Sequence, residues 1–182
     1  TGRELNLAKH CDLVIVNDPA NLAQFEQVTR AYYQPHSYDP DVHRPGPGRP
    51  EWACDIAFCG TAFESRIAFL EQVDWPTDRV LLGGLWQRLP EGHRFDRWLL
   101  SPKRDECLEN VETVELYQSA KMSFNLYRSM TEDGGHGSAG TPWAMGPREV
   151  ELAACGTFFL RESRGEGDEV LPMLPTFETP AE

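Results

Sequence analysis

A short helix with a charged first turn is the part of this sequence best suited to chemistry. Pro147 is suited to the first turn of the predicted helix, because proline lacks the amide hydrogen that would have no partner there. Gly156 suits the left-handed position after the end of the helix. The N-terminus of such a helix attracts anions. Arg148 in the first turn opposes the helix dipole, which indicates a role other than helix stability, and Glu149 and Glu151 accompany it. On spacing alone, charges that simply face water are an equal alternative.

The residues that follow this first turn resemble a known donor-binding motif. Glu151-Leu-Ala-Ala-Cys-Gly followed by an apolar strand is similar to the E-A-x-A-x-G helix of GT-B glycosyltransferases, whose glutamate holds the ribose of a nucleotide-sugar. The longer string from Arg148 to Leu160 resembles one branch, the CgeB-type (spore protein) glycosyltransferase-like proteins. Three more strings extend the resemblance over about residues 10–177, and they are Pro35-His-Ser-Tyr-Asp-Pro, Asp55-Ile-Ala-Phe-Cys-Gly-Thr and Tyr117-Gln-Ser-Ala-Lys-Met-Ser-Phe-Asn125.

The resemblance implies a function and a set of binding residues. It implies a metal-independent GT-B glycosyltransferase without a cofactor, which moves a sugar from a nucleotide-sugar donor to an acceptor that the sequence does not identify. Glu151 would accept hydrogen bonds from the ribose hydroxyls, and Arg148 would neutralise a phosphate oxygen or pair with Glu151. His136, whose imidazole titrates near neutrality, is the candidate catalytic residue. The other candidate donor-binding residues follow predicted strands, and they are Gly60, Thr61, Arg66, Asn125 and Arg128.

One position departs from the pattern of retaining GT-B enzymes. Their E-x7-E signature places a second acidic residue eight positions before the ribose glutamate, and Trp143 stands there in this chain. Retaining and inverting chemistry therefore both stay open. One alternative is a non-catalytic nucleotide-binding or structural module derived from the GT-B fold, and another is a scaffold that binds a protein partner. We expect Glu149 to point away from the site, and Glu166, Asp168 and Glu169 to form a solvated acidic face.

Alternating apolar runs and helical segments must position these residues. Strands are expected at 54–59, 79–84, 121–127 and 157–160, and helices at 63–73, 111–120, 147–155 and near 168–174. Ahead of them we expect helices at 3–10 and 20–29 and strands at 11–16 and 31–36. The alternation predicts an α/β fold with a Rossmann-like parallel sheet and helices on both faces. Ligands of such sheets bind beyond the carboxyl ends of the strands, where the candidate residues lie.

A segment rich in proline and glycine, residues 39–50, divides the chain and reads as a semi-rigid linker. By resemblance, residues 1–45 are expected to be the end of an N-terminal Rossmann-like domain with the linker. Residues 46–182 are expected to be most of a C-terminal nucleotide-sugar-binding domain. The chain is accordingly expected to be a fragment or a reduced version of the family.

Composition limits the classes of partner. The 182 residues carry 17 Lys and Arg against 29 Asp and Glu, a net charge of −12, which disfavours nucleic acids and anionic membranes. A phosphate-bearing ligand would need a local positive pocket. We expect no membrane span, and five cysteines without C-x-x-C spacing indicate buried thiols in a reducing cytoplasm rather than a zinc site. P-loop and G-x-S-x-G motifs are absent, and the first βα turn lacks the G-x-G-x-x-G pattern of dinucleotide-binding folds.

Overall fold

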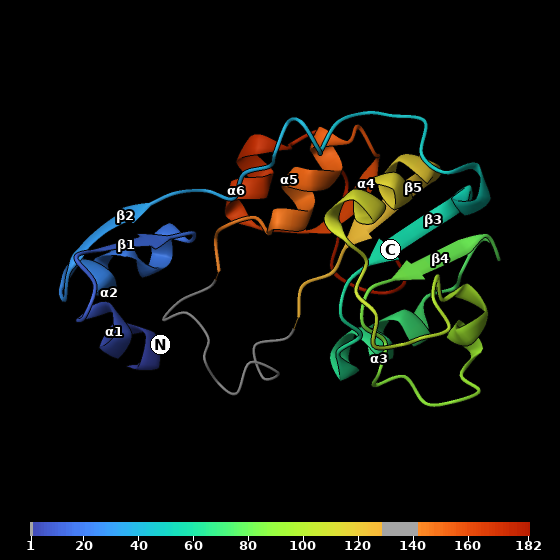
Figure 1. Ribbon diagram of the computed structural model, residues 1–182, viewed down its shortest axis with the longest axis horizontal. Helices are drawn as coiled ribbons and strands as arrows, with labels where there is room; N and C mark the ends of the chain where they lie inside the picture. The colour runs from blue at the N-terminus through green and yellow to red at the C-terminus, as the bar shows by residue number, and fades with distance from the viewer. Residues whose placement is uncertain (1, 129–141) are drawn as a thin grey trace.

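The computed structural model describes residues 2–128 and 142–182 and contains two parallel sheets (Figure 1). The larger sheet has five strands in the order β4-β3-β5-β6-β7, and every neighbouring pair is parallel. Its strands are β3 Cys54–Cys59, β4 Val80–Gly83, β5 Ala120–Asn125, β6 Phe159–Glu162 and β7 Thr176–Phe177. The predicted Rossmann-like α/β fold is confirmed.

The direction of the strand order changes between β3 and β5. From β3 the chain moves outward to β4, and from β4 it crosses back over β3 to pair β5 on the opposite side. The pairing of Ala57 with Ser123 fixes the register of these two strands. In open α/β sheets the crevice for a ligand opens at such a switch point, beyond the carboxyl ends of the two strands.

Helices cover both faces of this sheet because its strands are apolar on both sides. In β3, Ile56 and Phe58 pack toward α3 Glu64–Gln72, whereas Ala57 and Cys59 pack toward the other face. That other face is covered by α4 Asn110–Ser119 and α5 Pro147–Ala154, which contribute Tyr117 and Leu152 to the core. Continuous apolar strands between two helical layers are typical of parallel sheets.

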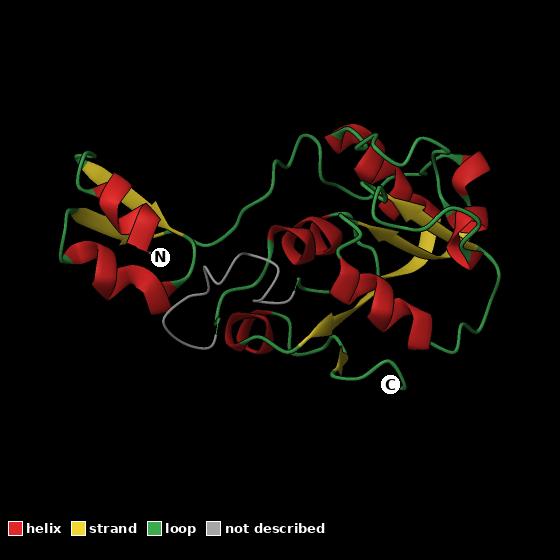
Figure 2. Ribbon diagram, turned by 90° about the horizontal axis from the view of Figure 1, so that it is seen from below, coloured by secondary structure: helices red, strands yellow, loops and turns green. Residues whose placement is uncertain are grey.

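The N-terminal residues form a separate small unit on the left of Figure 1, and Figure 2 shows the same separation from below. Its two parallel strands are β1 Leu13–Val16 and β2 Arg30–Tyr33. Its helices are α1 Gly2–Ala8, the 3₁₀ helix η1 Pro19–Asn21 and α2 Leu22–Glu26. We call residues 2–34 the N-terminal unit.

The proline-rich segment is fastened along the larger unit for part of its length. The Gln118 side chain of α4 donates to Arg44 O at 2.6 Å, and the Arg49 guanidinium lies 2.5 Å from the carboxylate of Glu115. The Ser119 hydroxyl bonds both the amide and the carbonyl of Arg49, and the 3₁₀ helix η2 Pro50–Trp52 follows. The second half of the predicted linker is therefore docked rather than free.

Other element predictions are partly wrong. The helix expected near 168–174 is α6 Gly165–Val170, and β5 ends at Asn125 rather than 127. Strand β7 and the 3₁₀ helix η3 Arg94–Trp98 were not expected. All five cysteines are free, and Cys11 and Cys107 are exposed rather than buried. In the described ranges, none of the helices combines the length and apolarity that crossing a bilayer requires.

Candidate functional site

The switch point collects several of the predicted donor-binding residues. Gly60 and Thr61 follow β3 directly, Arg66 lies in the first turn of α3, and Asn125 ends β5. The Arg66 guanidinium donates to Thr61 O at 2.9 Å, so these two candidates lie together. Gly60 N donates to Gly83 O at 3.0 Å, which joins the turns after β3 and β4. The turn after β3 is therefore a tightly bonded structure at the carboxyl edge of the sheet.

Arg148 and Glu151 form an ion pair on α5, on the side that faces the end of β3. Arg148 Nη1 lies 3.0 Å from Glu151 Oε2, and the two side chains are 35% and 22% exposed. The guanidinium lies 6.0 Å from the ring centroid of the buried Tyr117. Burial raises the pKa of Cys59, the last residue of β3, and the charges of Arg148 and Glu151 act on that thiol in opposite directions. The pair therefore borders the switch point and keeps access to solvent.

Tyr117 also shapes the electrostatics of this pair. Burial acts to lower the pKa of Arg148, but Tyr117, Cys59 and Glu151 outweigh it, and the pKa is raised. The pKa of Tyr117 itself lies well above its usual value, because burial disfavours its anion. The guanidinium is consequently a permanent charge, held in place by one carboxylate and one aromatic ring.

The N-terminus of α5 is already capped by a carboxyl group of the protein itself. Glu149 is 0% exposed, and its Oε2 accepts hydrogen bonds from Gly146 N at 2.9 Å and from the Tyr127 hydroxyl. The prediction that Glu149 points away from the site is therefore wrong. The physical reason is the capping geometry, in which a carboxylate three residues into a helix folds back onto the amide before its first turn. Glu149 occupies the position where an external anion would bind these amides.

Tyr127 joins the three loops at the carboxyl edge. Its amide donates to Glu162 Oε2, and its hydroxyl accepts from Gly146 N at 2.9 Å. The Arg164 guanidinium stacks 4.1 Å above its ring and donates to Pro142 O at 3.0 Å. Through Tyr127 the loops after β5, before α5 and after β6 behave as one structure.

Three polar atoms below the first turn of α5 have no hydrogen-bond partner among the described residues. They are Asn125 Nδ2, Glu149 Oε1 and Arg161 Nε, on side chains that are 6%, 0% and 2% exposed. Asn125 and Arg161 are partners in the β5–β6 register, and the charge of Arg161 acts on Glu149. Glu149 thus keeps one carboxylate oxygen that none of the described residues bonds, close enough to Arg161 to be influenced by its charge.

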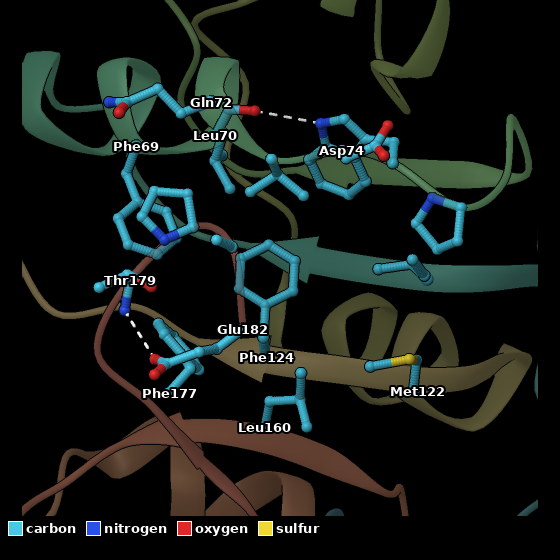
Figure 3. Close-up of a pocket in the computed structure, with 16 residues that line it drawn as sticks. Phe69, Leu70, Gln72, Asp74, Met122, Phe124, Leu160, Phe177, Thr179 and Glu182 are labelled. Carbon is cyan, nitrogen blue, oxygen red and sulfur yellow. Dashed lines mark hydrogen bonds between the residues drawn. The ribbon is translucent and has the colours of Figure 1, made fainter.

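A pocket with a volume of about 540 Å³ lies between α3 and the face of the sheet that α3 covers. Figure 3 shows Phe69 and Leu70 of α3 facing Met122, Phe124 and Leu160 of the strands. Its rim includes Thr179 and Glu182, whose carboxylate accepts from Thr179 N at 3.0 Å. None of the candidate donor-binding residues lines it, so this apolar pocket and the polar site are distinct.

Comparison with known proteins identifies the family. Residues 66–179 match the family model described as glycosyl transferase-like, which is more than half of the chain. The chain belongs to the glycosyl transferase-like family. No curated protein matches the chain. The matched range runs from Arg66 to Thr179 and so includes the Arg148–Glu151 pair, Asn125 and the Tyr127 network of this glycosyl transferase-like protein.

The remaining sequence predictions meet different outcomes. His136 lies outside the described residues, and Arg128 is exposed at the last position described before them. Trp143, at the position where the resemblance places an acidic residue, packs edge-on against Tyr33 with ring centroids 6.5 Å apart. The prediction that Glu166 is solvated is wrong, because it is 5% exposed and accepts from Met145 N at 2.7 Å.

Sequence reasoning missed Tyr127, Glu162 and Arg164, the residues that join the loops. Tyr127 lies two residues beyond Asn125, and Glu162 ends β6. A signal for both existed, because polar residues directly after buried strands lie at the ligand-binding edge of a parallel sheet. Burial raises the pKa of Glu162, against the lowering effects of the Tyr127 amide and of the Arg164 and Arg66 charges. Arg164 and Arg66 therefore provide local positive charge near Glu162, although the net charge of the chain is −12.

Glu149 should make the stability of the protein depend on pH. Burial raises its pKa above the ordinary 4.5, outweighing the hydrogen bonds from Tyr127 and Gly146 N. A raised folded-state pKa gives a contribution that is fully present below the unfolded pKa and is lost as pH rises through the folded pKa. We therefore expect Glu149→Gln to gain stability relative to the unmodified protein as pH rises from about 4 to about 8, measured by urea unfolding.

The exposed Glu169 gives a matched control for this measurement. Glu169→Gln removes the same charge from a solvated position, and its difference from the unmodified protein should be almost independent of pH. A Glu149→Gln difference that stayed constant, or that moved in the opposite direction, would contradict the assignment.

Proposed function

We propose that this chain carries the donor-binding part of a GT-B glycosyltransferase, which transfers a sugar from a nucleotide-sugar to an acceptor. The observation that carries the proposal is the position of the Arg148–Glu151 pair. It lies beside the end of β3 at the switch point of the sheet, partly exposed, in a member of the glycosyl transferase-like family. Glu151 would accept hydrogen bonds from the ribose hydroxyls, which bind a charged acceptor more strongly than a neutral one.

The leaving diphosphate would be stabilised mainly by guanidinium groups. Glu149 and Tyr127 already take the amide of Gly146, and Pro147 has no amide hydrogen, so these positions of α5 offer little to a phosphate. Arg148 and Arg66 border the same edge of the sheet. Positive groups fixed in advance around the developing charge lower the barrier for departure of a diphosphate. In this mechanism the cationic side chains take the role that a metal ion plays elsewhere, and no cofactor is used.

The finer assignments belong to the same proposal. The strings around Asp55, Tyr117 and Arg148 support a CgeB-type relationship within the family. The separate N-terminal unit and the docked segment that follows it support a division near residue 45, with the donor domain after it. Five free cysteines fit a reducing compartment, and we place the protein in the cytoplasm.

A non-catalytic nucleotide-binding module is the second candidate. The observation that favours it is Trp143, an aromatic residue at a position where retaining relatives carry a carboxylate, packed between Tyr33 and Gly165. An indole in that environment can support the fold of the loop. Unlike a carboxylate, it cannot accept a hydrogen bond from a sugar hydroxyl. The two candidates share donor binding and differ in turnover.

A nucleotide screen followed by a turnover assay tests the proposal. We expect one of UDP, GDP, ADP or dTDP, at about a hundred times its dissociation constant, to stabilise the protein by about 2.7 kcal/mol. For a domain of this size that corresponds to a melting shift of roughly 5–10 °C. Release of the sugar from the matching nucleotide-sugar supports the enzyme, and binding without release supports the module. If none of the four nucleotides shifts the transition, both candidates are rejected.

A further inference from the structure

The four residues before α5 are held by carboxylates that come from both units of the molecule. Asp18 of the N-terminal unit is 8% exposed, and its Oδ2 accepts from Trp143 N at 3.0 Å and from Ala144 N at 3.3 Å. Its other oxygen accepts from Ala20 N at 2.9 Å, which caps η1. One buried side chain of the N-terminal unit therefore fixes two consecutive amides of the segment that leads into α5.

Glu166 completes the connection from the opposite side. Its Oε2 accepts from Met145 N at 2.7 Å, and its Oε1 accepts from the Tyr33 hydroxyl at 2.7 Å. Its own amide donates to Trp143 O at 3.0 Å. Burial, together with the hydrogen bond and charge of Glu166 and the charge of Asp18, raises the pKa of Tyr33 to about 12. The hydroxyl therefore stays protonated and donates a hydrogen bond to Glu166.

Packing reinforces these hydrogen bonds. The Trp143 indole lies between the ring of Tyr33 and the backbone of Gly165, where an added Cβ would come within 2.2 Å of the indole. A side chain larger than glycine at 165 would push the indole away. The small residue in the first turn of α6 thus allows the aromatic contact between the two units.

We propose that Asp18 and Tyr33 are positioning residues for the donor site. They set where the segment 142–146 ends and therefore where the first turn of α5 places Arg148 and Glu151. We call the contact between the two units, made by Asp18, Tyr33, Trp143 and Glu166, the joint. The donor site would accordingly reach its binding geometry only when the joint is formed. The effect on donor binding rests on the proposed function, whereas the effect on the segment does not.

Hydrogen exchange of the intact chain, followed by mass spectrometry, tests the joint without any nucleotide. In the unmodified protein one Asp18 oxygen accepts from the amides of 143 and 144, and the other accepts from Ala20 N. Asp18→Asn keeps only one acceptor oxygen, so either the amides of 143 and 144 or that of Ala20 lose their partner. We expect peptides covering 143–145 to exchange about tenfold faster or more, since a hydrogen bond to a charged group is worth at least one such factor. Peptides from β3 and β5 should keep their rates.

Two further variants make the result decisive. Tyr33→Phe removes only the hydroxyl that Glu166 accepts, so the proposal also predicts faster exchange at Met145 in a variant with an intact fold. Asp12→Asn is the matched control, because it removes the same charge from an exposed position in the same unit and should exchange like the unmodified protein. If Asp18→Asn accelerates exchange throughout the N-terminal unit, that variant has destabilised the whole unit. The exchange of Met145 in Tyr33→Phe then decides the test by itself. Unchanged exchange at 143–145 in both variants overturns the proposal.

Nucleotide titration then tests the link to the donor site. With the nucleoside diphosphate that binds the unmodified protein, Asp18→Asn should lose affinity about fivefold or more, the usual lower range of coupling between sites, and Asp12→Asn should not. By reciprocity the same nucleotide should slow exchange at 143–145 in the unmodified protein. Equal affinities for all variants would leave a structural joint but overturn its positioning role. Absence of any nucleotide binding would reject the proposed function while the exchange result stood by itself.

Discussion

Gly84→Ala should lower the free energy of unfolding by about 3 kcal/mol or more, because the added methyl group meets both an unfavourable backbone conformation and a neighbouring backbone. The backbone at Gly84 has a φ of +96°, which costs a residue with a Cβ about 1–3 kcal/mol. The added Cβ would also lie 2.5 Å from Gly60 O and 2.9 Å from Gly60 N and C. Because the overlap is with backbone, no side chain can rotate away, and overpacking adds about 1–3 kcal/mol.

Gly92 separates the two contributions. Its φ is +75°, but an added Cβ would meet no atom within 4 Å. Gly92→Ala should therefore cost only the conformational part, about 1–2 kcal/mol. Urea unfolding of both variants measures the difference, with a similar dependence on denaturant expected for each. Equal losses in the two variants would show that the close approach of the turns after β3 and β4 is not what requires glycine at 84.

Glu151→Gln should weaken binding of the nucleoside diphosphate about tenfold or more and leave the fold intact. Hydrogen bonds to a charged acceptor contribute about 1.5–3 kcal/mol, whereas an amide oxygen makes weaker ones. The Glu151 side chain is 22% exposed and pairs with Arg148 at 3.0 Å, and the exchange of one carboxylate oxygen for nitrogen leaves no cavity. Calorimetric titration gives the affinity, and Glu169→Gln at an exposed position is the control.

A 2′-deoxynucleotide makes the assignment of Glu151 more specific. If the carboxylate accepts from the ribose hydroxyls, the deoxy analogue lacks one of the donors before any mutation is made. The loss caused by Glu151→Gln should then be smaller for the deoxy analogue than for the ribonucleotide, as a double-mutant cycle requires for a direct contact. An identical loss for both would place Glu151 away from the 2′-hydroxyl.

The fold of the larger unit could be predicted because local sequence patterns mark its strands and helices. The run Cys54–Cys59 is apolar on both faces, and Pro147 and Gly156 bracket α5, so the elements next to the switch point were expected at nearly their observed positions. Strand β7 could not be expected, since Thr176–Phe177 has two residues and follows a proline. Helix α6 was predicted to start too late, because its first turn contains Gly165 and Gly167 and glycine has a low helix propensity. These glycines are required by packing, since a side chain at 165 would overlap Trp143 and one at 167 would overlap Arg161.

The polar site was predictable only where one element carries both partners. Arg148 and Glu151 are three residues apart on one helix, and their pairing was among the expected roles. Glu149 and Glu166 looked like surface charges, since a sequence gives no sign that Tyr127, Met145 or Tyr33 will bury them. Their partners are distant in the chain or lie in loops, and it is the tertiary structure that supplies them.

The segment that connects the two units has a consequence for how they stay together. Gln34 still bonds to Val16 in the N-terminal unit, and Arg44 is already bonded to α4, so only residues 35–43 span the distance. A tether this short holds the N-terminal unit at an effective concentration in the millimolar range. Contacts too weak to hold two separate proteins together can therefore remain formed most of the time. A proteolytic cut within 35–43 would leave the contacts among Asp18, Tyr33, Trp143 and Glu166 in place, yet the two pieces would come apart on dilution.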